Sequence, residues 1–247
     1  MTLLLAHISD LHLDEGTRAT ERATHALNHL TQLSRRPDAL LVTGDVAHTP
    51  ATARYHQAAH LLDLPFPVLT CPGSHDDRAA LRQHLLGLAP TTGPLNQLHH
   101  LNGTAVLVCD STTPGREGGH LRPSTLMWIN HTLQELPENT PALLALHHPP
   151  ARVHHPLADH LRLDNAQDLA GLLRAHPRVA GILVGHAHTG GATTFAGRPL
   201  LLAPALIRSA PMPWDSEHTA AMDQPPGVAF HLLDDEHRLT THFRALV

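Results

Sequence analysis

Two side chains that can bind a metal ion, Asp10 and His12, follow the first apolar run of the chain with one residue between them. The run, residues 3–8, has the length and composition of a buried strand. Side chains just past the carboxyl end of such a strand lie where open α/β sheets place their chemistry. A carboxylate oxygen with an imidazole nitrogen favours Mn, Fe or Zn over Ca or Mg. The motif alone is weak, since Asp235 and His237 repeat it in a predicted exposed turn.

Four later apolar runs end in candidate ligands in the same way. The positions are Asp45 after residues 38–43, Ser74, His75 and Asp76 after residues 66–71, His147 after residues 141–146, and His186 and His188 after residues 179–184. Ligands on separate strand ends converge if the strands are neighbours, as a parallel α/β sheet provides. Their nitrogens and carboxylates suit a pair of transition metals that share one carboxylate. Gly44, Gly73 and Gly185 precede ligands at points where a strand must turn sharply and leave room for substrate.

Helical segments alternate with the strands in the first three quarters of the chain. The spacing predicts helices at residues 17–36, 51–62, 77–86, 123–136 and 165–175, with another strand at 104–110. Strand–helix–strand alternation indicates right-handed parallel crossovers. Later segments predict antiparallel strands, at residues 193–195 with 200–202 and at 228–233 with 239–246. Residues 151–163, rich in His and Pro, are predicted to form an active-site loop, and residues 209–226 a polar loop. No linker is evident, so we expect residues 1–247 to form a single α/β domain, a sandwich of two sheets with helices outside.

Composition narrows the class of protein. The chain has 247 residues, of which 42% are apolar, enough for a substantial core. Its net charge is −5 and it has no polybasic run, so we expect no nucleic-acid partner. No apolar stretch approaches the roughly 18 residues of a membrane span, so we expect no membrane partner. Cys71 and Cys109 form no close motif, and we expect reduced, buried thiols in a cytoplasmic protein.

Taken in order, the strand-end motifs resemble those of a known superfamily. Asp10-x-His12, Gly44-Asp45, Gly73-x-His75-Asp76, His147 and Gly185-His186-x-His188 resemble the calcineurin-like metallophosphoesterases. The longer matches at residues 7–12, 75–78 and 146–150 are similar to class III cyclic nucleotide phosphodiesterases and their glycerophosphodiesterase relatives. The similarity covers most of residues 3–205. It implies a four-layer α/β/β/α sandwich of two mixed sheets flanked by helices.

The resemblance also implies roles for the candidate residues. One metal would be held by Asp10, His12, Asp45 and His188, and the other by Asp45, Ser74, His147 and His186, with Asp45 as the bridge. A hydroxide between the two metals would attack phosphorus in line with the leaving oxygen. His75 would contact the phosphate and protonate or stabilise the leaving oxygen, and Asp76 would orient His75. His148, in a His-Pro-Pro turn, would contact the substrate or serve in packing.

One position departs from the superfamily pattern. The pattern is Gly-Asn-His-Asp, and this chain has Ser74 in place of the asparagine. A serine hydroxyl is shorter than an asparagine amide and a weaker donor to a metal. Either Ser74 binds directly, or a water fills the gap, or the second site is partly occupied. We therefore expect weaker binding of the second metal than in a Ser74→Asn variant.

Three classes of function follow from these observations. The first is hydrolysis of phosphodiesters by a dinuclear metal centre, above all of 3',5'-cyclic nucleotides such as cAMP. The second is hydrolysis of other esters, such as glycerophosphodiesters or phosphomonoesters. The third is a non-catalytic scaffold with an incomplete metal site, for which Ser74 is the only support. The resemblance is compatible with a homodimer, and it leaves the native metals open among Mn, Fe and Zn.

The remaining histidines and one acid are assigned structural or surface roles. The chain has 25 histidines, so chance pairs are expected. The predicted surface pairs are His25 with His29 and His56 with His60, and the predicted loop positions are His154 and His155. Asp110, at the end of residues 104–110, is expected to cap or hydrogen-bond a turn.

Overall fold

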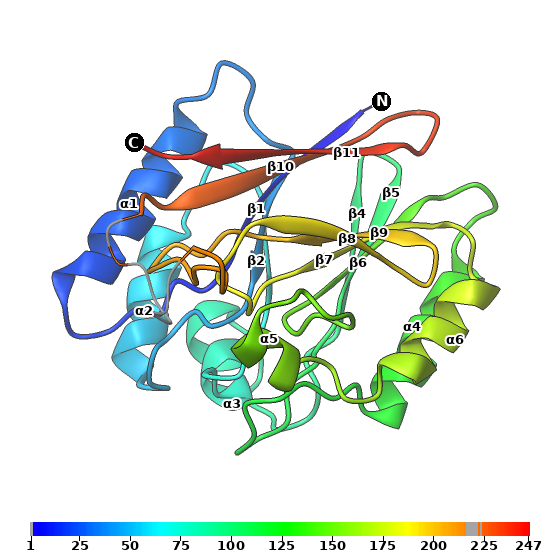
Figure 1. The fold of residues 1–247 in the computed structure, drawn as a ribbon, viewed down its shortest axis with the longest axis horizontal. Helices are drawn as coiled ribbons and strands as arrows, with labels where there is room; N and C mark the ends of the chain where they lie inside the picture. Colours follow the sequence, from blue (N-terminus) through cyan, green and yellow to red (C-terminus); the bar gives the residue numbers. More distant parts are fainter. Residues whose placement is uncertain (1, 216–221, 223) are drawn as a thin grey trace.

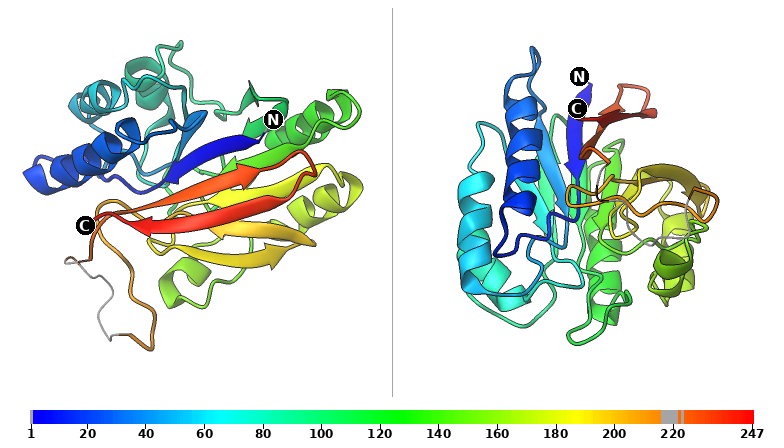
Figure 2. Two further views of the ribbon diagram at one scale, coloured as in Figure 1. Left: turned by 90° about the horizontal axis from the view of Figure 1, so that it is seen from above. Right: turned by 60° about the vertical axis from the view of Figure 1, so that its left-hand side comes forward.

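The apolar runs form the strands of two sheets that lie face to face, with helices on the outer face of each (Figure 1; Figure 2). The structure is a computed structural model that describes residues 2–215, 222 and 224–247. The layers run helix, sheet, sheet, helix. The predicted four-layer sandwich of two mixed sheets is confirmed.

The first sheet is built from both ends of the chain. Its strands, in spatial order, are β11 (Leu239–Ala245), β10 (Gly227–Leu233), β1 (Leu3–Ile8), β2 (Ala39–Thr43) and β3 (Val68–Cys71). β1, β2 and β3 are parallel, and β10 is antiparallel to both of its neighbours. The three strands that carry candidate ligands are therefore adjacent, and their carboxyl ends lie at one edge.

The second sheet takes the middle of the chain. Its strands, in spatial order, are β4 (Gln97–Leu101), β5 (Thr104–Val108), β6 (Ala142–Leu146), β7 (Val179–Val184), β9 (Arg198–Leu202) and β8 (Gly191–Phe195). β5, β6, β7 and β9 are parallel, whereas β4 and β8 are antiparallel edge strands. The two ligand-bearing strands β6 and β7 pair directly.

Helices occupy both outer layers and the connections at the ligand-bearing edge. They are α1 (Thr17–Thr31), α2 (Thr52–Leu61), α3 (Arg78–Ala80), the π-helical turn Leu81–Leu85, α4 (Pro123–Glu135), α5 (Pro156–His160) and α6 (Ala166–Ala175). Pro123 opens α4, as expected for a residue without a backbone donor at the first helical position. Within the described part of the chain, no helix is both long and apolar enough to span a membrane.

Three hydrophobic clusters hold the layers together, and strand alternation explains them. On β1, Ala6 and Ile8 face the cluster under α1 and α2, whereas Leu3 and Leu5 face the space between the sheets. On β6, Leu144 likewise belongs to the cluster under α4 and α6. Strands buried on both faces need continuous apolar sequence, which is the pattern these runs show. The central cluster, with members from both sheets, fixes one sheet against the other.

Three segments differ from the sequence-based expectations. β4 has no counterpart among the predicted strands, because its half-exposed Gln-Leu-His-His-Leu sequence lacks the apolar signal of a buried strand. The predicted loop 151–163 contains the short helix α5. The predicted helix 17–36 ends at Thr31, with Gln32 as its C-cap. Of the predicted loop 209–226, residues 216–221 and 223 lie outside the described residues.

Candidate metal centre

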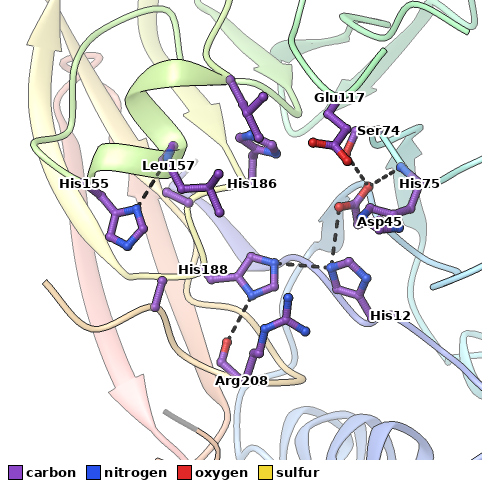
Figure 3. Close-up of a pocket in the computed structure, with 14 residues that line it drawn as sticks. His12, Asp45, Ser74, His75, Glu117, His155, Leu157, His186, His188 and Arg208 are labelled. Atoms are coloured by element: carbon purple, nitrogen blue, oxygen red, sulfur yellow. Dashed lines mark hydrogen bonds and ion pairs between the residues drawn. The ribbon is translucent and has the colours of Figure 1, made fainter. Parts of the chain in front are cut away.

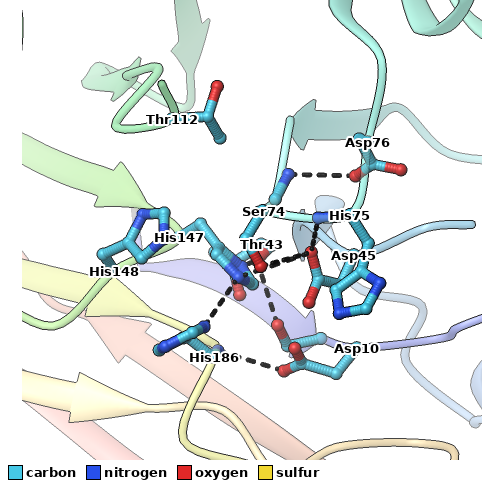
Figure 4. Close-up of polar contacts among 12 residues, drawn as sticks. Asp10, Thr43, Asp45, Ser74, His75, Asp76, Thr112, His147, His148 and His186 are labelled. Atoms are coloured by element: carbon cyan, nitrogen blue, oxygen red, sulfur yellow. Dashed lines mark hydrogen bonds and ion pairs between the residues drawn. The ribbon is translucent and has the colours of Figure 1, made fainter. Parts of the chain in front are cut away.

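Five strand ends from the two sheets meet at one edge of the sandwich (Figure 4). The first sheet contributes the segments after β1, β2 and β3, and the second contributes those after β6 and β7. The ligands therefore converge from two facing sheets, and not from one parallel sheet alone. Gly185 lies so close to Ser9 and Thr43 that a methyl group added there would collide with both. This contact brings the end of β7 against the ends of β1 and β2.

The first half of the centre, which we call site one, contains two carboxylates and two histidines. His12 Nε2 lies 3.2 Å from His188 Nε2 and 3.5 Å from Asp45 Oδ2. His188 Nε2 lies 3.4 Å from Asp10 Oδ1. Asp10, His12 and Asp45 are almost fully buried, and His188 reaches the surface of a cavity. All four sequence-predicted residues of this site are brought together.

The second half, site two, shares Asp45 with the first. Asp45 Oδ1 lies 3.5 Å from His147 Nε2 and 3.5 Å from the Ser74 hydroxyl. His147 Nε2 lies 3.1 Å from His186 Nδ1. Asp45 Oδ1 also accepts a hydrogen bond from the backbone N–H of His75, at 2.9 Å. The two oxygens of Asp45 thus face different ligand sets, as a bridging carboxylate requires.

The donor spacing fits a pair of metal ions. Two donors that are each about 2.0–2.2 Å from one ion, at roughly tetrahedral to octahedral angles, lie about 3–3.5 Å apart. The donor separations in both halves fall in this range. Within the described part of the chain, Asp10 Oδ1 is buried with no hydrogen-bond partner, an arrangement that costs stability unless a ligand is bound there. The residues present therefore fit two transition-metal ions, with imidazole and carboxylate donors typical of Mn, Fe or Zn.

The ligands themselves carry unusual backbone conformations. Five of the seven candidate ligand residues have left-handed φ values, namely Asp10 (55°), His12 (46°), Asp45 (49°), His186 (66°) and His188 (53°). Residues with a side chain rarely adopt this region, and such positions concentrate at functional sites. From the sequence, the sharp turns after the strands were expected at Gly44, Gly73 and Gly185. Of the three glycines, only Gly44 has a positive φ, of 86°, so the ligands take most of that strain.

Gly44 also makes room for the second site. A Cβ on Gly44 would lie 2.6 Å from Gly73 N and 2.7 Å from His147 Nδ1. A Cβ on Gly73 would collide with the backbone nitrogen and the carboxylate of Asp45. The turns after β2 and β3 are therefore in direct contact, and no larger residue fits at either glycine.

The protonation states of the buried ligands are mostly those that metal binding needs. Burial lowers the pKa of His12 to about 2, and burial together with the His147 charge lowers the pKa of His186 to about 3. Burial alone would raise the pKa of Asp10, but His188 and the other nearby imidazoles lower it below its usual value. Burial would also lower the pKa of His147, but the two buried carboxylates raise it. Neutral imidazoles and an ionised carboxylate accept a metal without first losing a proton.

His75 and Asp76 occupy different environments. His75 lines the cavity in front of the metal centre, and its Nδ1 lies 2.9 Å from the carbonyl oxygen of His48. The Asp76 carboxylate instead accepts hydrogen bonds from the backbone N–H groups of Val46, Ala47 and Gly73. Burial and the nearby Asp45 charge raise the pKa of Asp76 to about 6. Asp76 therefore joins the turns after β2 and β3, while the His48 carbonyl orients the His75 ring.

His148 is fully buried behind the centre. Its Nδ1 lies 2.8 Å from the Ser111 hydroxyl, and its Nε2 lies 2.9 Å from the Glu117 carbonyl. Both ring nitrogens thus have protein partners, an arrangement that favours the packing alternative for this residue.

Asp110 also makes contacts that hold the fold together. Its carboxylate accepts hydrogen bonds from the backbone N–H groups of Leu95 and Thr112 and forms an ion pair with the buried Arg78 at 2.6 Å.

A cavity of about 190 Å³ opens in front of the two sites (Figure 3). Its lining includes five of the predicted ligands and His75, together with Glu117, His155, Leu157 and Arg208. His155 belongs to the predicted active-site loop and does line the cavity, and it also caps α5 by accepting the backbone N–H of Ala158. Glu117 and Arg208 belong to no motif and do not follow a predicted strand. Nothing in the sequence pattern therefore indicates that they line the cavity.

The site and the fold have counterparts among known proteins. The family model described as calcineurin-like phosphoesterase matches residues 3–190, and the chain belongs to this family. A cAMP/cGMP dual specificity phosphodiesterase of Mycobacterium tuberculosis is 36% identical over 216 residues, which cover 82% of this chain and 67% of the relative. The glycerophosphodiester phosphodiesterase GpdQ of Enterobacter lignolyticus is 27% identical over 241 residues, covering 93% and 86%. The predicted superfamily is confirmed, as is the assignment as a metal-dependent phosphoesterase.

A solved structure supports the fold independently. The dimetal phosphatase from Danio rerio superposes with a TM-score of 0.67 at 12% identity, covering 99% of both chains. At that identity the likeness concerns the architecture alone. The four-layer arrangement is therefore shared with a protein whose sequence has diverged widely.

Proposed function

We propose that this protein hydrolyses phosphodiesters, with 3',5'-cyclic nucleotides such as cAMP as the principal class. The observation that carries the proposal is Asp45, whose two carboxylate oxygens face two separate ligand sets at the floor of a cavity lined by His75. The substrate class is supported by curated relatives named cyclic nucleotide phosphodiesterases, at 32–36% identity over about four fifths of the chain.

In this proposal the two sites hold two ions of Mn, Fe or Zn. Site one uses Asp10, His12, Asp45 and His188, and site two uses Asp45, Ser74, His147 and His186. When bound, the ions lower the pKa of water to supply a nucleophile and offset charge on the phosphoryl oxygens. The rigid turns after β1, β2 and β7 hold their ligands in place before substrate arrives, which is the preorganisation such a site needs.

In this proposal His75 acts as the general acid that protonates the leaving group. Because its Nδ1 faces the carbonyl oxygen of His48, Nδ1 must carry a proton and donate it to that oxygen. Nε2 is then the free atom, and in the imidazolium form it donates a proton to the departing alkoxide. Removal of such a general acid typically slows a reaction by about 10²–10⁴-fold.

The test is a kinetic panel with a matched variant. Manganese-loaded protein is assayed with cAMP, cGMP, a glycerophosphodiester, bis(p-nitrophenyl) phosphate and p-nitrophenyl phosphate. We expect the highest kcat/KM for the cyclic nucleotides. We also expect His75→Asn to lower kcat about 10²-fold or more while the bound manganese is unchanged. Equal rates for His75→Asn and wild type, or hydrolysis of the activated aryl esters alone, would contradict the proposal.

Glycerophosphodiesters are the second candidate substrates. The observation in their favour is that the GpdQ relative aligns with 93% of this chain, a longer stretch than the cyclic nucleotide phosphodiesterases align with. A glycerophosphodiester with a higher kcat/KM than cAMP in the same panel would select this candidate. The scaffold alternative predicts no turnover of any ester even with both metals bound.

Three further properties belong to the proposal. We infer a single folding unit, because the central cluster contains residues of both sheets, and one unfolding transition would test this. A cytoplasmic location is supported by Cys71 and Cys109, which are both buried and free, and cell fractionation would test it. A homodimer stays a prediction that light scattering would check.

A further inference from the structure

Arg208 is held beside site one by its main chain. The segment after β9 follows the end of β1, with Leu206 N donating to Ser9 O at 3.1 Å and Ile207 N to Asp10 O at 3.3 Å. His188 Nδ1 lies 3.3 Å from the Arg208 carbonyl. Both Asp10 and His188 are candidate ligands of site one, so these contacts fix the Arg208 backbone relative to the metal centre.

The guanidinium group of Arg208 lies at the cavity, close to the ligands of site one. Figure 3 shows it beside His188 and His12 and across the cavity from Glu117. Among the residues that the structure describes, the Arg208 side chain forms no hydrogen bond or ion pair. A half-buried cation beside two metal sites is repelled by bound metal ions unless an anion lies between them.

We propose that Arg208 binds the non-bridging oxygens of the phosphoryl group that is attacked, an inference that rests on the proposed function. The planar guanidinium presents paired N–H donors that match two phosphoryl oxygens. Those oxygens gain negative charge as the nucleophile adds, so the interaction strengthens toward the transition state. Arg208 thereby differs from His75, which acts on the leaving oxygen.

Glu117 sets the orientation that this binding mode requires. Its carboxylate lines the cavity opposite Arg208. A carboxylate repels the phosphoryl oxygens, whereas a hydroxyl or amino group of the substrate can donate to it. The phosphoryl group therefore belongs on the Arg208 side of the cavity, over site one.

The experiment compares Arg208→Gln and Arg208→Lys with the wild type and with Arg18→Gln, a control on the exposed face of α1. Each protein is loaded with manganese, and its manganese content and thermal unfolding are recorded first. Binding of inorganic phosphate is then measured by isothermal titration, and kcat and KM are measured with bis(p-nitrophenyl) phosphate and cAMP.

We expect Arg208→Gln to weaken phosphate binding about tenfold and to lower kcat/KM about 100-fold, as for loss of one charged donor to a developing oxyanion. Manganese content stays at the wild-type value, Arg208→Lys recovers part of the loss, and Arg18→Gln behaves as wild type. Unchanged phosphate affinity in Arg208→Gln would overturn the inference, as would a loss of manganese that accounts for the lower activity. If the wild type hydrolyses no diester, the proposed function fails, while the phosphate titration still tests Arg208.

Discussion

The two halves of the metal centre differ in the strength of their ligands. Site one offers two carboxylates, Asp10 and Asp45, with two imidazoles at separations of 3.2–3.5 Å. Site two offers two imidazoles and the shared Asp45, and completes its set with the hydroxyl of Ser74. A neutral hydroxyl is a poor donor compared with a carboxylate. In the proposed centre we therefore expect one strong site and one weaker site that share Asp45.

Both halves are held by contacts between strand ends. Site one depends on β1 and β7, whose ends are joined by the bond from His186 N to Asp10 Oδ2, at 3.1 Å. Site two depends on the turn after β3, which is fixed by Asp76 and by close contact of Gly73 with Asp45. Because hydrogen bonds hold the strand ends in both halves, we attribute the weaker binding expected at site two to the hydroxyl of Ser74.

The largest expected effect comes from removing the bridge. Asp45→Asn keeps the shape of the side chain but removes the charge that both halves share. We expect both metals to bind more weakly and kcat/KM to fall about 10³-fold or more, which is about 4 kcal/mol of transition-state stabilisation. Metal analysis and kinetics measure the change, with the exposed Asp63→Asn as control. Retention of either metal at wild-type affinity would show that the halves do not share Asp45.

An intermediate effect should come from strengthening the weak half. Ser74→Asn replaces the hydroxyl by a longer amide oxygen at the same turn. We expect about tenfold tighter binding of the second metal, about 1.4 kcal/mol, together with a gain in turnover. The exposed Ser34→Asn is the matched control. If the wild type with Ser74 already binds two metals tightly, and Ser74→Asn neither binds them more tightly nor turns over faster, the two halves do not differ as proposed.

The smallest expected effect concerns the buried histidines behind site one. His231 Nε2 lies 3.0 Å from His7 Nδ1 on β1, and His7 Nε2 lies 2.9 Å from the Thr43 hydroxyl on β2. Burial lowers the pKa of His231 to about 3, while an unfolded histidine titrates near 6.5. The folded state therefore requires the neutral form. Its stabilising contribution is complete above pH 6.5 and is lost as the pH falls toward 3.

This effect can be isolated with a residue that does not titrate. Between pH 7 and pH 5 we expect the free energy of unfolding of His231→Gln to fall by about 2 kcal/mol less than that of the wild type. Urea titration at each pH measures the difference, with His25→Gln on the exposed face of α1 as control. Parallel pH profiles for His231→Gln and wild type would show that His231 gains a proton in the folded state.

Much of this centre was predictable because ligands directly follow apolar strands. Asp10, Asp45 and His147 each follow such a strand, and the structure brings these three donors within 4.8 Å of one another. The order of motifs then predicted the family and the four layers. By contrast, the left-handed φ values of the ligands were not predicted: Asp and His adopt this region more often than most residues, but in most of their occurrences they do not.

Other features lacked a sequence signal for physical reasons. Arg208 reaches the cavity through long-range contacts with Ser9, Asp10 and His188, which no local pattern encodes. The His48 carbonyl orients His75 through a backbone atom, which every residue possesses. β4 is a half-exposed edge strand, and such strands carry little hydrophobic pattern.

The most direct test is to locate the metals crystallographically. Crystals of the protein soaked in manganese are measured at a wavelength where manganese scatters anomalously. We predict two peaks on either side of the Asp45 carboxylate, the stronger beside Asp10, His12 and His188 and the weaker beside Ser74, His147 and His186. A single ion, an Asp45 carboxylate that bridges nothing, or manganese bound elsewhere would contradict the account.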